Sequence, residues 1–218
     1  MKTALVFAGG DPPPREVLGD LDRSAIVIAA DSGLDQALAL GFTADVVVGD
    51  LDSVTPEGLT RARASGADVE PHPAEKDETD LELALRRART LGVQRVTVIG
   101  GGGGRHDHLL ANALVLAHDH YAGLELDAIV GTARLTVIRT RAEMRGEPGS
   151  FLSLLPLGGP ARGIRTEGLR YPLRDEELVP GTTRGVSNEF LAPIAEVSLV
   201  DGVLLAVQPD ALSHTSES

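Results

Sequence analysis

The chain has 218 residues, of which 42% are hydrophobic and 24% are charged, and this is the composition of an ordinary globular protein. It contains no cysteine, so a disulfide-stabilised scaffold is excluded. Asp and Glu, with 32 residues, outnumber the 20 Lys and Arg residues, and the resulting net charge of −12 disfavours binding to nucleic acid. The same charge suits a cationic small substrate, or a phosphate ligand that arrives with a divalent cation.

The apolar runs of the sequence are too short for membrane targeting or insertion. The first run, Ala4–Ala8, is shorter than the core of a signal peptide. The longest aliphatic run, Ala25–Ala30, is far shorter than a bilayer span. We therefore expect a cytoplasmic protein that has no membrane partner.

The first 131 residues alternate short aliphatic runs with helical patterns. Because solid apolar runs are typical of strands buried on both faces, this part predicts a doubly wound α/β domain with a mostly parallel sheet. The clearest helix is Asp80–Leu91, whose apolar positions share one face and whose start, Thr79 with Glu82, has the pattern of a capping box. A second helix is expected over about 108–120. The predicted strands are Ala4–Ala8, Ala25–Ala30, Asp45–Val48, Asp68–Pro71, Arg95–Ile99 and Leu126–Val130.

After residue 131 the pattern changes to short strands separated by Gly and Pro, without a convincing helix. Such a pattern is typical of a β-sandwich or barrel, so we predict an all-β domain over 132–212. The polar residues 213–218 are expected to form a disordered tail. The expected strands are Arg134–Arg139, Phe151–Leu155, Gly185–Ser187, Ile194–Leu199 and Val203–Val207.

Polar loops follow four of the predicted strands in the first domain. Because an open parallel sheet binds its ligand at the carboxyl ends of the strands, we expect these loops to converge on one site. The loops are Asp31-Ser32-Gly33, Gly49-Asp50-Leu51-Asp52-Ser53, Glu75-Lys76-Asp77-Glu78-Thr79-Asp80 and Gly100 to His108.

Asp50 and Asp52 lie two residues apart just beyond a strand. If the chain is still extended there, both carboxylates point the same way and repel each other unless a cation lies between them. A hard divalent cation such as Mg²⁺ fits this pair, with Asp80 as a further ligand. The alternatives are a solvated turn for the pair and a favourable helix-dipole position for Asp80.

Lys76 is notable because the chain has only one other lysine, Lys2, among its 20 basic residues. Its ammonium group is suited to neutralising a transferred phosphate as a point charge. The alternative is a simple ion pair with the neighbouring Glu75.

The glycine run Gly100–Gly104 permits close approach of a ligand and leads into a helix N-terminus, which is a common anion site. It matches neither the dinucleotide fingerprint nor a Walker loop, because Arg105 takes the third glycine position and no Gly-Lys-Ser/Thr follows. Arg105 offers a guanidinium fork to phosphate oxygens.

Asp107 is either functional or only the helix N-cap. His106 and His108 do not indicate zinc, because no cysteine supports them.

Taken together, these loops resemble those of the thiamine pyrophosphokinase family. Two departures are Ser32, where the family often has glycine, and Tyr171, where it has tryptophan. The matching stretches follow the family's order over nearly the whole chain: Asp31–Gly33, Gly49–Ser53, Glu75–Asp80, Gly103–His108 with Asn112, Thr166–Leu173 and Gly185–Glu189.

The resemblance implies transfer of the pyrophosphoryl group of ATP to the hydroxyl of thiamine, which gives thiamine diphosphate and AMP. It also implies an α/β domain followed by a β-sandwich domain, in a homodimer with its sites at the subunit interface. On this basis we expect Mg²⁺ ligands at Asp50, Asp52 and Asp80; nucleotide contacts from Asp31, Ser32, Gly33, Lys76, Thr79, Gly102, Gly103, Gly104 and Arg105; thiamine contacts from Asp107, His108, Asn112, Tyr171, Ser187 and Asn188; and catalytic roles for Asp52, Lys76, Asp80, Arg105 and Asp107.

Two other functions stay open at this point. A diphosphokinase for another acceptor, such as a pterin alcohol, would use the same aspartate loop, but the stretch Gly168–Tyr171 in the β half argues against it. A nucleotide-binding regulator without catalysis is the second alternative. Such a regulator has no physical need for clustered carboxylates, so Asp50, Asp52 and Asp80 argue against it.

Overall fold

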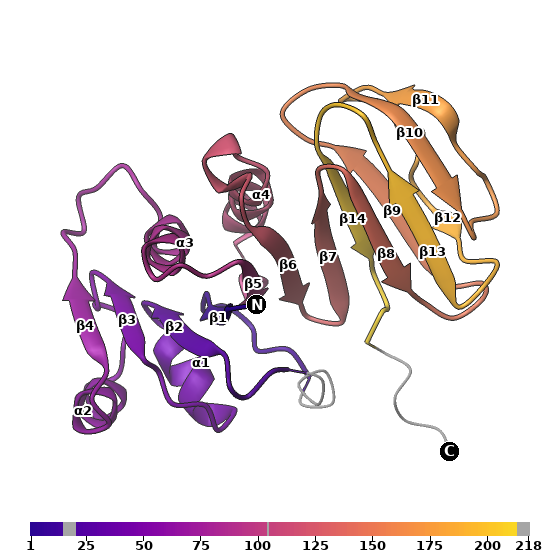
Figure 1. The fold of residues 1–218 in the computed structure, drawn as a ribbon. Coiled ribbons are helices and arrows are strands. Elements are labelled where there is room, and N and C mark those ends of the chain that lie inside the picture. The colour runs from indigo at the N-terminus through magenta and orange to yellow at the C-terminus, as the bar shows by residue number, and fades with distance from the viewer. Residues whose placement is uncertain (15–20, 104, 213–218) are drawn as a thin grey trace, which may run out of the picture. The chain divides into compact units, whose positions relative to one another are not determined.

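The computed structural model describes residues 1–14, 21–103 and 105–212. The chain forms two compact units (Figure 1). Unit 1 contains residues 1–115 and 123–131, and unit 2 contains residues 116–122 and the chain from Thr132 onward. Residues 116–122 thus belong to unit 2, although the sequence pattern predicts a first domain that runs unbroken to residue 131. The predicted tail, 213–218, lies outside the described residues.

Unit 1 is built on a parallel sheet that confirms the strand predictions to within one residue at each end. The strands are β1 (Thr3–Phe7), β2 (Ile26–Ala30), β3 (Val46–Gly49), β4 (Asp68–Pro71), β5 (Arg95–Ile99) and β6 (Glu125–Val130). They lie side by side in the order β6-β5-β1-β2-β3-β4, and each neighbouring pair is parallel. Every residue of β3 is buried, as a strand covered on both faces requires.

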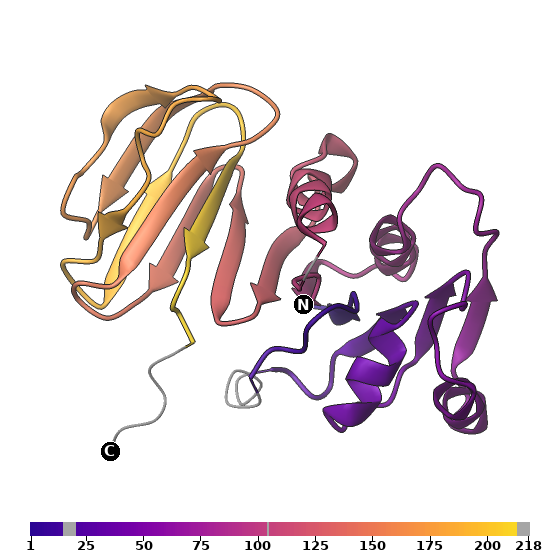
Figure 2. The same cartoon turned by 180° about the vertical axis from the view of Figure 1, so that it is seen from behind.

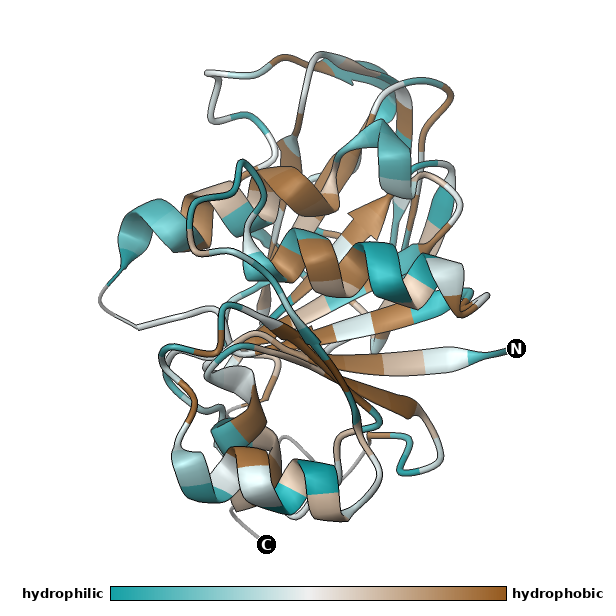
Figure 3. Ribbon diagram, turned by 90° about the vertical axis from the view of Figure 1, so that its left-hand side faces the viewer, coloured by the Kyte–Doolittle hydropathy of each residue, from teal (hydrophilic) through white to brown (hydrophobic). Residues whose placement is uncertain are grey.

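Helices cover both faces of this sheet: α1 (Gly33–Ala39) and α2 (Pro56–Ala64) lie on one face, and α3 (Asp80–Thr90) and α4 (His106–Leu116) on the other (Figures 1 and 2). Apolar residues, brown in Figure 3, run along the strands, whereas apolar and polar residues alternate around the helices. In the described residues, no helix combines the length and the hydropathy that a membrane span requires.

The start of α3 confirms the predicted capping box. The Thr79 hydroxyl accepts a hydrogen bond from the Glu82 N–H at 3.3 Å, and the Glu82 carboxylate accepts one from the Thr79 N–H at 3.0 Å. The helix expected over 108–120 is shorter than predicted, because α4 ends at Leu116. His118 interrupts it: its ring accepts a hydrogen bond from the His120 N–H at 3.0 Å and begins a separate 3₁₀ turn.

The outer strand β4 of unit 1 carries charges along its length. Arg87 of α3 pairs with Asp68 at 2.8 Å and with Glu70 at 2.6 Å. Pro71 ends the strand. In the described residues β4 pairs with β3 only, so its other side is an edge of the sheet.

Unit 2 is a β-sandwich of two antiparallel sheets, as predicted. The strands of one layer lie in the order β12-β9-β14-β7, which is part of a ten-stranded sheet, and those of the other layer form a four-stranded sheet with the order β11-β10-β13-β8. Side chains from both sheets, including Leu152, Ile164 and Phe190, form one buried core. The strands are β7 (Ala133–Ile138), β8 (Arg141–Arg145), β9 (Phe151–Pro156), β10 (Ala161–Glu167), β11 (Arg174–Leu178), β12 (Asn188–Glu189), β13 (Ile194–Ser198) and β14 (Leu204–Gln208).

Unit 2 differs from the sequence predictions in several of its strands and in one turn. Strands β8, β10 and β11 were not predicted, because they are rich in charged residues; β8 buries only Met144 and β11 only Leu178. The expected strand Gly185–Ser187 is a turn, since Gly185 has φ 97° and Ser187 has φ 57°. The short strand β12 starts directly after this turn, at Asn188.

Candidate active site

The strand order of unit 1 reverses between β1 and β5, and the loops that follow these two strands touch. The Gly101 N–H donates to the Gly9 carbonyl at 2.7 Å, and the Asp11 N–H donates to the Gly102 carbonyl at 3.0 Å. A ligand crevice is expected at such a reversal point of an open α/β sheet. The predicted glycine loop therefore packs against a second loop, Gly9–Asp11, which was not among the predicted site residues.

The loop after β2 joins the same surface through an unusually close backbone approach. A Cβ atom at Gly33 would lie 2.0 Å from the Phe7 carbonyl oxygen and 3.0 Å from the Gly9 nitrogen. Only glycine therefore allows α1 to begin against the end of β1. The backbones of the loops after β1, β2 and β5 consequently lie against one another.

Three carboxylates gather at the carboxyl ends of β2 and β3. Asp31, Asp50 and Asp52 each place an oxygen within 4.8 Å of the others, and they form the only such group of potential metal ligands in the described residues. Asp31 Oδ1 is buried and accepts no hydrogen bond from the described chain. Burial raises the pKa of Asp31 and the nearby aspartate charges add to it, although the Ser32 N–H opposes them. This donor set fits a hard divalent cation.

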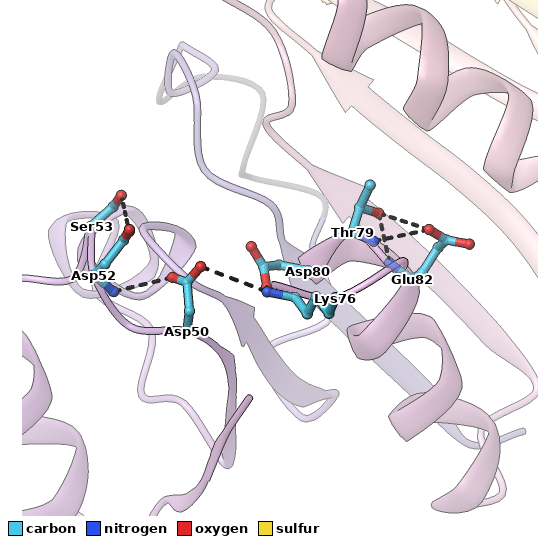
Figure 4. Close-up of polar contacts among 7 residues, drawn as sticks. All are labelled: Asp50, Asp52, Ser53, Lys76, Thr79, Asp80 and Glu82. Carbon is cyan, nitrogen blue, oxygen red and sulfur yellow. Dashed lines mark hydrogen bonds and ion pairs between the residues drawn. The ribbon is translucent and has the colours of Figure 1, made fainter. Parts of the chain in front are cut away.

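The loop that carries Asp50 and Asp52 is a turn and not the extended segment that we expected. Leu51 has φ 65°, a left-handed conformation that costs a non-glycine residue of order 1 kcal/mol. The Asp52 N–H donates to Asp50 Oδ1 at 3.2 Å, and Ser53 Oγ donates to Asp52 Oδ1 at 2.8 Å (Figure 4). The turn, and not the two-residue alternation of a strand, brings the two carboxylates together.

Lys76 lies between Asp50 and Asp80 (Figure 4). Its Nζ is 3.1 Å from Asp80 Oδ1 and 3.7 Å from Asp50 Oδ2. Burial lowers the pKa of Lys76, but the hydrogen bonds and negative charges of Asp80 and Asp50 outweigh this effect and raise it. Among the described residues its ion-pair partners are therefore these two aspartates and not Glu75. Asp80, which we expected to complete the metal site, pairs with Lys76, and Asp31 takes its place in the three-carboxylate group.

Asp35 of α1 anchors the far end of the aspartate loop. Its carboxylate accepts hydrogen bonds from the Thr55 N–H at 2.9 Å and from the Thr55 hydroxyl at 2.5 Å. The same hydroxyl accepts a hydrogen bond from the Gly58 N–H at 3.0 Å and so caps α2. The loop between β3 and α2 is thereby fixed to α1.

Arg105, the predicted phosphate ligand, pairs with Asp107 at the start of α4. Its Nε lies 2.9 Å from Asp107 Oδ1 and its Nη2 lies 2.7 Å from Oδ2, while Nη2 is also 2.8 Å from His108 Nε2. The Arg105 guanidinium holds the pKa of Asp107 well below its usual range. Because α4 begins at His106, Asp107 lies within its first turn and is not the N-cap. Asn112, one turn further along, has its Nδ2 3.2 Å from the place of a Cβ at Gly101.

The other predicted nucleotide-binding residues are divided between the loops. Ser32 precedes α1 and makes no side-chain cap, whereas the Thr79 hydroxyl serves in the cap of α3. Gly103 lies against Asp11, since a Cβ there would come within 2.4 Å of that carboxylate. Gly102 accepts the hydrogen bond from the Asp11 N–H described above. Gly104 lies outside the described residues.

Unit 2 has a pocket of about 450 Å³ beside Tyr171. Tyr171 is 58% exposed, whereas Phe7, Tyr121 and Phe190 are buried in the cores. A pocket of this size, lined by an aromatic ring and a few polar groups, is typical of a small-molecule site. It is lined by Tyr171, Pro172, Leu173, Thr183, Arg184, Gly185, Val186 and Asn188.

Asn188 holds the backbone of Tyr171. Its Oδ1 accepts hydrogen bonds from the N–H groups of Tyr171 at 3.0 Å and Glu189 at 2.9 Å, and its Nδ2 donates to the Tyr171 carbonyl at 2.8 Å. Arg170 lies 5.7 Å from the centre of the Tyr171 ring and pairs with Glu189 at 2.7 Å. The Ser187 N–H, in its left-handed turn, donates to Ser153 Oγ at 3.0 Å. Asn188 thus fixes the backbone that carries the aromatic ring, and its amide is occupied by backbone groups.

Two residue sets were missed or misassigned from the sequence. The Gly9–Asp11 loop has a recognisable sequence pattern, because a Gly-Gly pair follows the first strand almost directly. The place of Asp31 beside Asp50 had none, because it depends on the pairing of β2 with β3 and on a hydrogen bond from the Asp31 N–H to the Val48 carbonyl at 2.8 Å.

Comparison with known proteins identifies the family. The family model "thiamin pyrophosphokinase, catalytic domain" matches residues 17–126, and "thiamin pyrophosphokinase, vitamin B1 binding domain" matches residues 136–204. The thiamine pyrophosphokinase of Bacillus subtilis is 28% identical over 221 residues, covering 95% of this chain and 99% of the relative.

Solved structures of two relatives share the fold. The crystal structure of the Bacillus subtilis thiamine pyrophosphokinase superposes with a TM-score of 0.83 at 27% identity, covering 95% of this chain and 98% of the other. That of the Geobacillus thermodenitrificans thiamin pyrophosphokinase gives a TM-score of 0.78 at 26% identity, covering 95% and 97%. With both family models matched in order, this chain belongs to the thiamine pyrophosphokinase family.

Proposed function

We propose that this protein transfers the pyrophosphoryl group of ATP to the hydroxyl of thiamine, giving thiamine diphosphate and AMP. The observation that carries this proposal is the group of Asp31, Asp50 and Asp52 at the ligand-binding edge of the sheet. Transfer from a polyphosphate needs positioning and charge neutralisation more than covalent catalysis, and a carboxylate cluster that holds a cation meets this need.

Asp31, Asp50 and Asp52 would hold Mg²⁺, and the buried, unpartnered Oδ1 of Asp31 supports this assignment. Bound Mg²⁺ supplies neutralisation of the charge on the transferred phosphates. Asp80 pairs with Lys76 and keeps it beside the site. Lys76 then offers its ammonium group to the transferred group.

The glycine-containing loops after β1, β2 and β5, together with Arg105, are proposed to bind the ATP phosphates. Because glycine has no side chain, these loops let phosphate oxygens approach the backbone. Ser32 and Gly33 would lie on one side of the phosphates, and Gly102 and Gly103 on the other. Arg105 offers a guanidinium fork whose orientation is set by Asp107. Either Asp80 or Asp107 is proposed to orient the thiamine hydroxyl, with His108 and Asn112 nearby on α4.

The pocket beside Tyr171 is proposed to hold thiamine. A flat cationic heterocycle gains stacking and cation–π attraction on a tyrosine ring. Asn188 holds the backbone of Tyr171, and Ser187 directly precedes Asn188 in the chain.

We further propose that the protein is a cytoplasmic homodimer with its sites at the subunit interface. Leu110 and Leu114 support an interface at α4, because these two apolar residues, one helical turn apart, are 67% and 58% exposed.

The test is release of AMP from ATP and Mg²⁺ with thiamine, with a pterin alcohol, or without an acceptor. The proposal expects AMP and thiamine diphosphate in equal amounts with thiamine only. AMP formation with the pterin alcohol alone would favour a different diphosphokinase. ATP binding without turnover would favour a nucleotide-binding regulator.

A further inference from the structure

Asp50 belongs to two groups of charges at once. One carboxylate oxygen of Asp50 lies in the three-carboxylate group with Asp31 and Asp52. Its Oδ2 also lies 3.7 Å from Lys76 Nζ, which is 3.1 Å from Asp80 (Figure 4). The only ion pairs that the described residues make with these four aspartates come from Lys76. A single ammonium group therefore offsets the repulsion within a strongly acidic site.

The position of Lys76 disfavours a divalent cation on the same carboxylate. An ammonium group and a metal ion that share Asp50 repel each other at short range, and the repulsion is weakly screened because the three side chains are only 15–29% exposed. The lysine stem is flexible and its head is a compact point charge, so it is able to leave Asp50 while Asp80 keeps it near.

We propose that Lys76 is a tethered counter-ion: it stabilises the aspartates while the site holds no metal, and it gives up Asp50 when the metal binds. The released ammonium group then faces the phosphates instead of the carboxylate. This inference rests on the proposed function for the location of the metal. It predicts that Lys76 competes with the metal, whereas a lysine that merely organises the ligands would assist metal binding.

The sign of this effect is measurable with the full chain and Mn²⁺ alone, without nucleotide or thiamine. Free Mn²⁺ is titrated by its electron paramagnetic resonance signal against wild type, Lys76→Met and Lys2→Met. The chain's only other lysine is a matched control: Lys2→Met removes the same charge, but its Nζ donates to the Leu91 carbonyl at 2.6 Å, at the opposite end of α3 from Asp80.

We expect Lys76→Met to tighten the dissociation constant for Mn²⁺ by roughly threefold to thirtyfold, since one competing charge is lost. Lys2→Met should stay within about twofold of wild type. Equal or weaker Mn²⁺ binding by Lys76→Met would overturn the inference.

Thermal unfolding gives a second readout. In chelator, Lys76→Met should melt below Lys2→Met, because four aspartates are left without a cation, and saturating Mn²⁺ should close the gap. An unchanged melting temperature in chelator counts against the inference. If Lys76→Met does not fold, Lys76→Gln serves in both measurements, because it keeps a hydrogen-bond donor without the charge, and the same signs are required of it.

The two proposals fail separately. A chain that shows the expected Mn²⁺ competition but forms no thiamine diphosphate refutes the proposed function only. An active chain in which Lys76→Met binds Mn²⁺ no better than wild type refutes the tethered counter-ion only.

Discussion

Asp52 is the exposed member of the carboxylate group, while Asp31 and Asp50 are partly buried. Replacing it should therefore affect the chemistry and not the fold. We expect Asp52→Asn to lower kcat by roughly 10³-fold, a loss comparable to the removal of one strong electrostatic contact in an active site, with an unchanged melting temperature. Steady-state kinetics and calorimetry check both parts.

A matched control is Asp119→Asn, whose side chain is 96% exposed and pairs with Arg139 in unit 2. It makes the same chemical change away from the carboxylates and should leave turnover unchanged. Near-normal kcat in Asp52→Asn, or full activity of the wild type in chelator, would contradict the metal assignment.

Tyr171 is expected to contribute to thiamine affinity through its ring face. Tyr171→Ala should raise KM for thiamine roughly threefold to thirtyfold, which corresponds to about 0.5–2 kcal/mol of cation–π attraction, and should leave KM for ATP nearly unchanged. Tyr171→Phe keeps the ring and is the matched control. If Tyr171→Ala instead lowers the melting temperature and leaves KM for thiamine unchanged, the ring only packs the surface of the sandwich.

At the scale of the elements, the link between Asp35 and Thr55 joins α1 to α2 and fixes the aspartate loop between them. Asp35→Ala removes two hydrogen bonds to a charged group, so the free energy of unfolding should fall by about 1.5–3 kcal/mol. The released loop should also bind Mn²⁺ more weakly, as titration would show.

The control for this prediction is Asp35→Asn, which keeps one carbonyl acceptor for Thr55. It should lose less stability than Asp35→Ala and retain most of the Mn²⁺ affinity. Equal Mn²⁺ binding by wild type and Asp35→Ala would show that the aspartate loop holds its shape without α1.

How far the elements were predictable depends on where their side chains lie. The strands of the parallel sheet, such as Val46–Gly49, are buried on both faces, and a run of apolar residues reveals them. Strands β8 and β11 lie at the outside of their sheet and carry mostly charged residues, so the sequence gives little sign of them. The grouping of Asp31 with Asp50 depends on strand pairing and on the left-handed Leu51, neither of which has a local pattern.

At the scale of the whole molecule, a subunit mixture tests the proposed dimer. Asp52→Asn and Tyr171→Ala alter different units of the chain. If each site takes its carboxylates from one subunit and its tyrosine from the other, a mixed dimer has one site free of both changes. At thiamine concentrations well below KM, the activity per mixed dimer should therefore exceed that of either variant alone after subunit exchange.

The control is each variant exchanged with itself, which should show no rise. Exchange is followed with two different affinity tags, so that mixed dimers are counted directly. Mixed dimers without a rise in activity would indicate that each site is built from one subunit.

The charged outer strand β4 has a consequence for the behaviour of the protein in concentrated solution. An unpaired strand invites another chain to add to the sheet, which is a common route to aggregation. Here Pro71 ends the strand, and Arg87 binds the carboxylates of Asp68 and Glu70 beside it. A second molecule that docked on this edge would have to dehydrate these charges, so fibre-like growth from this edge of the sheet is disfavoured.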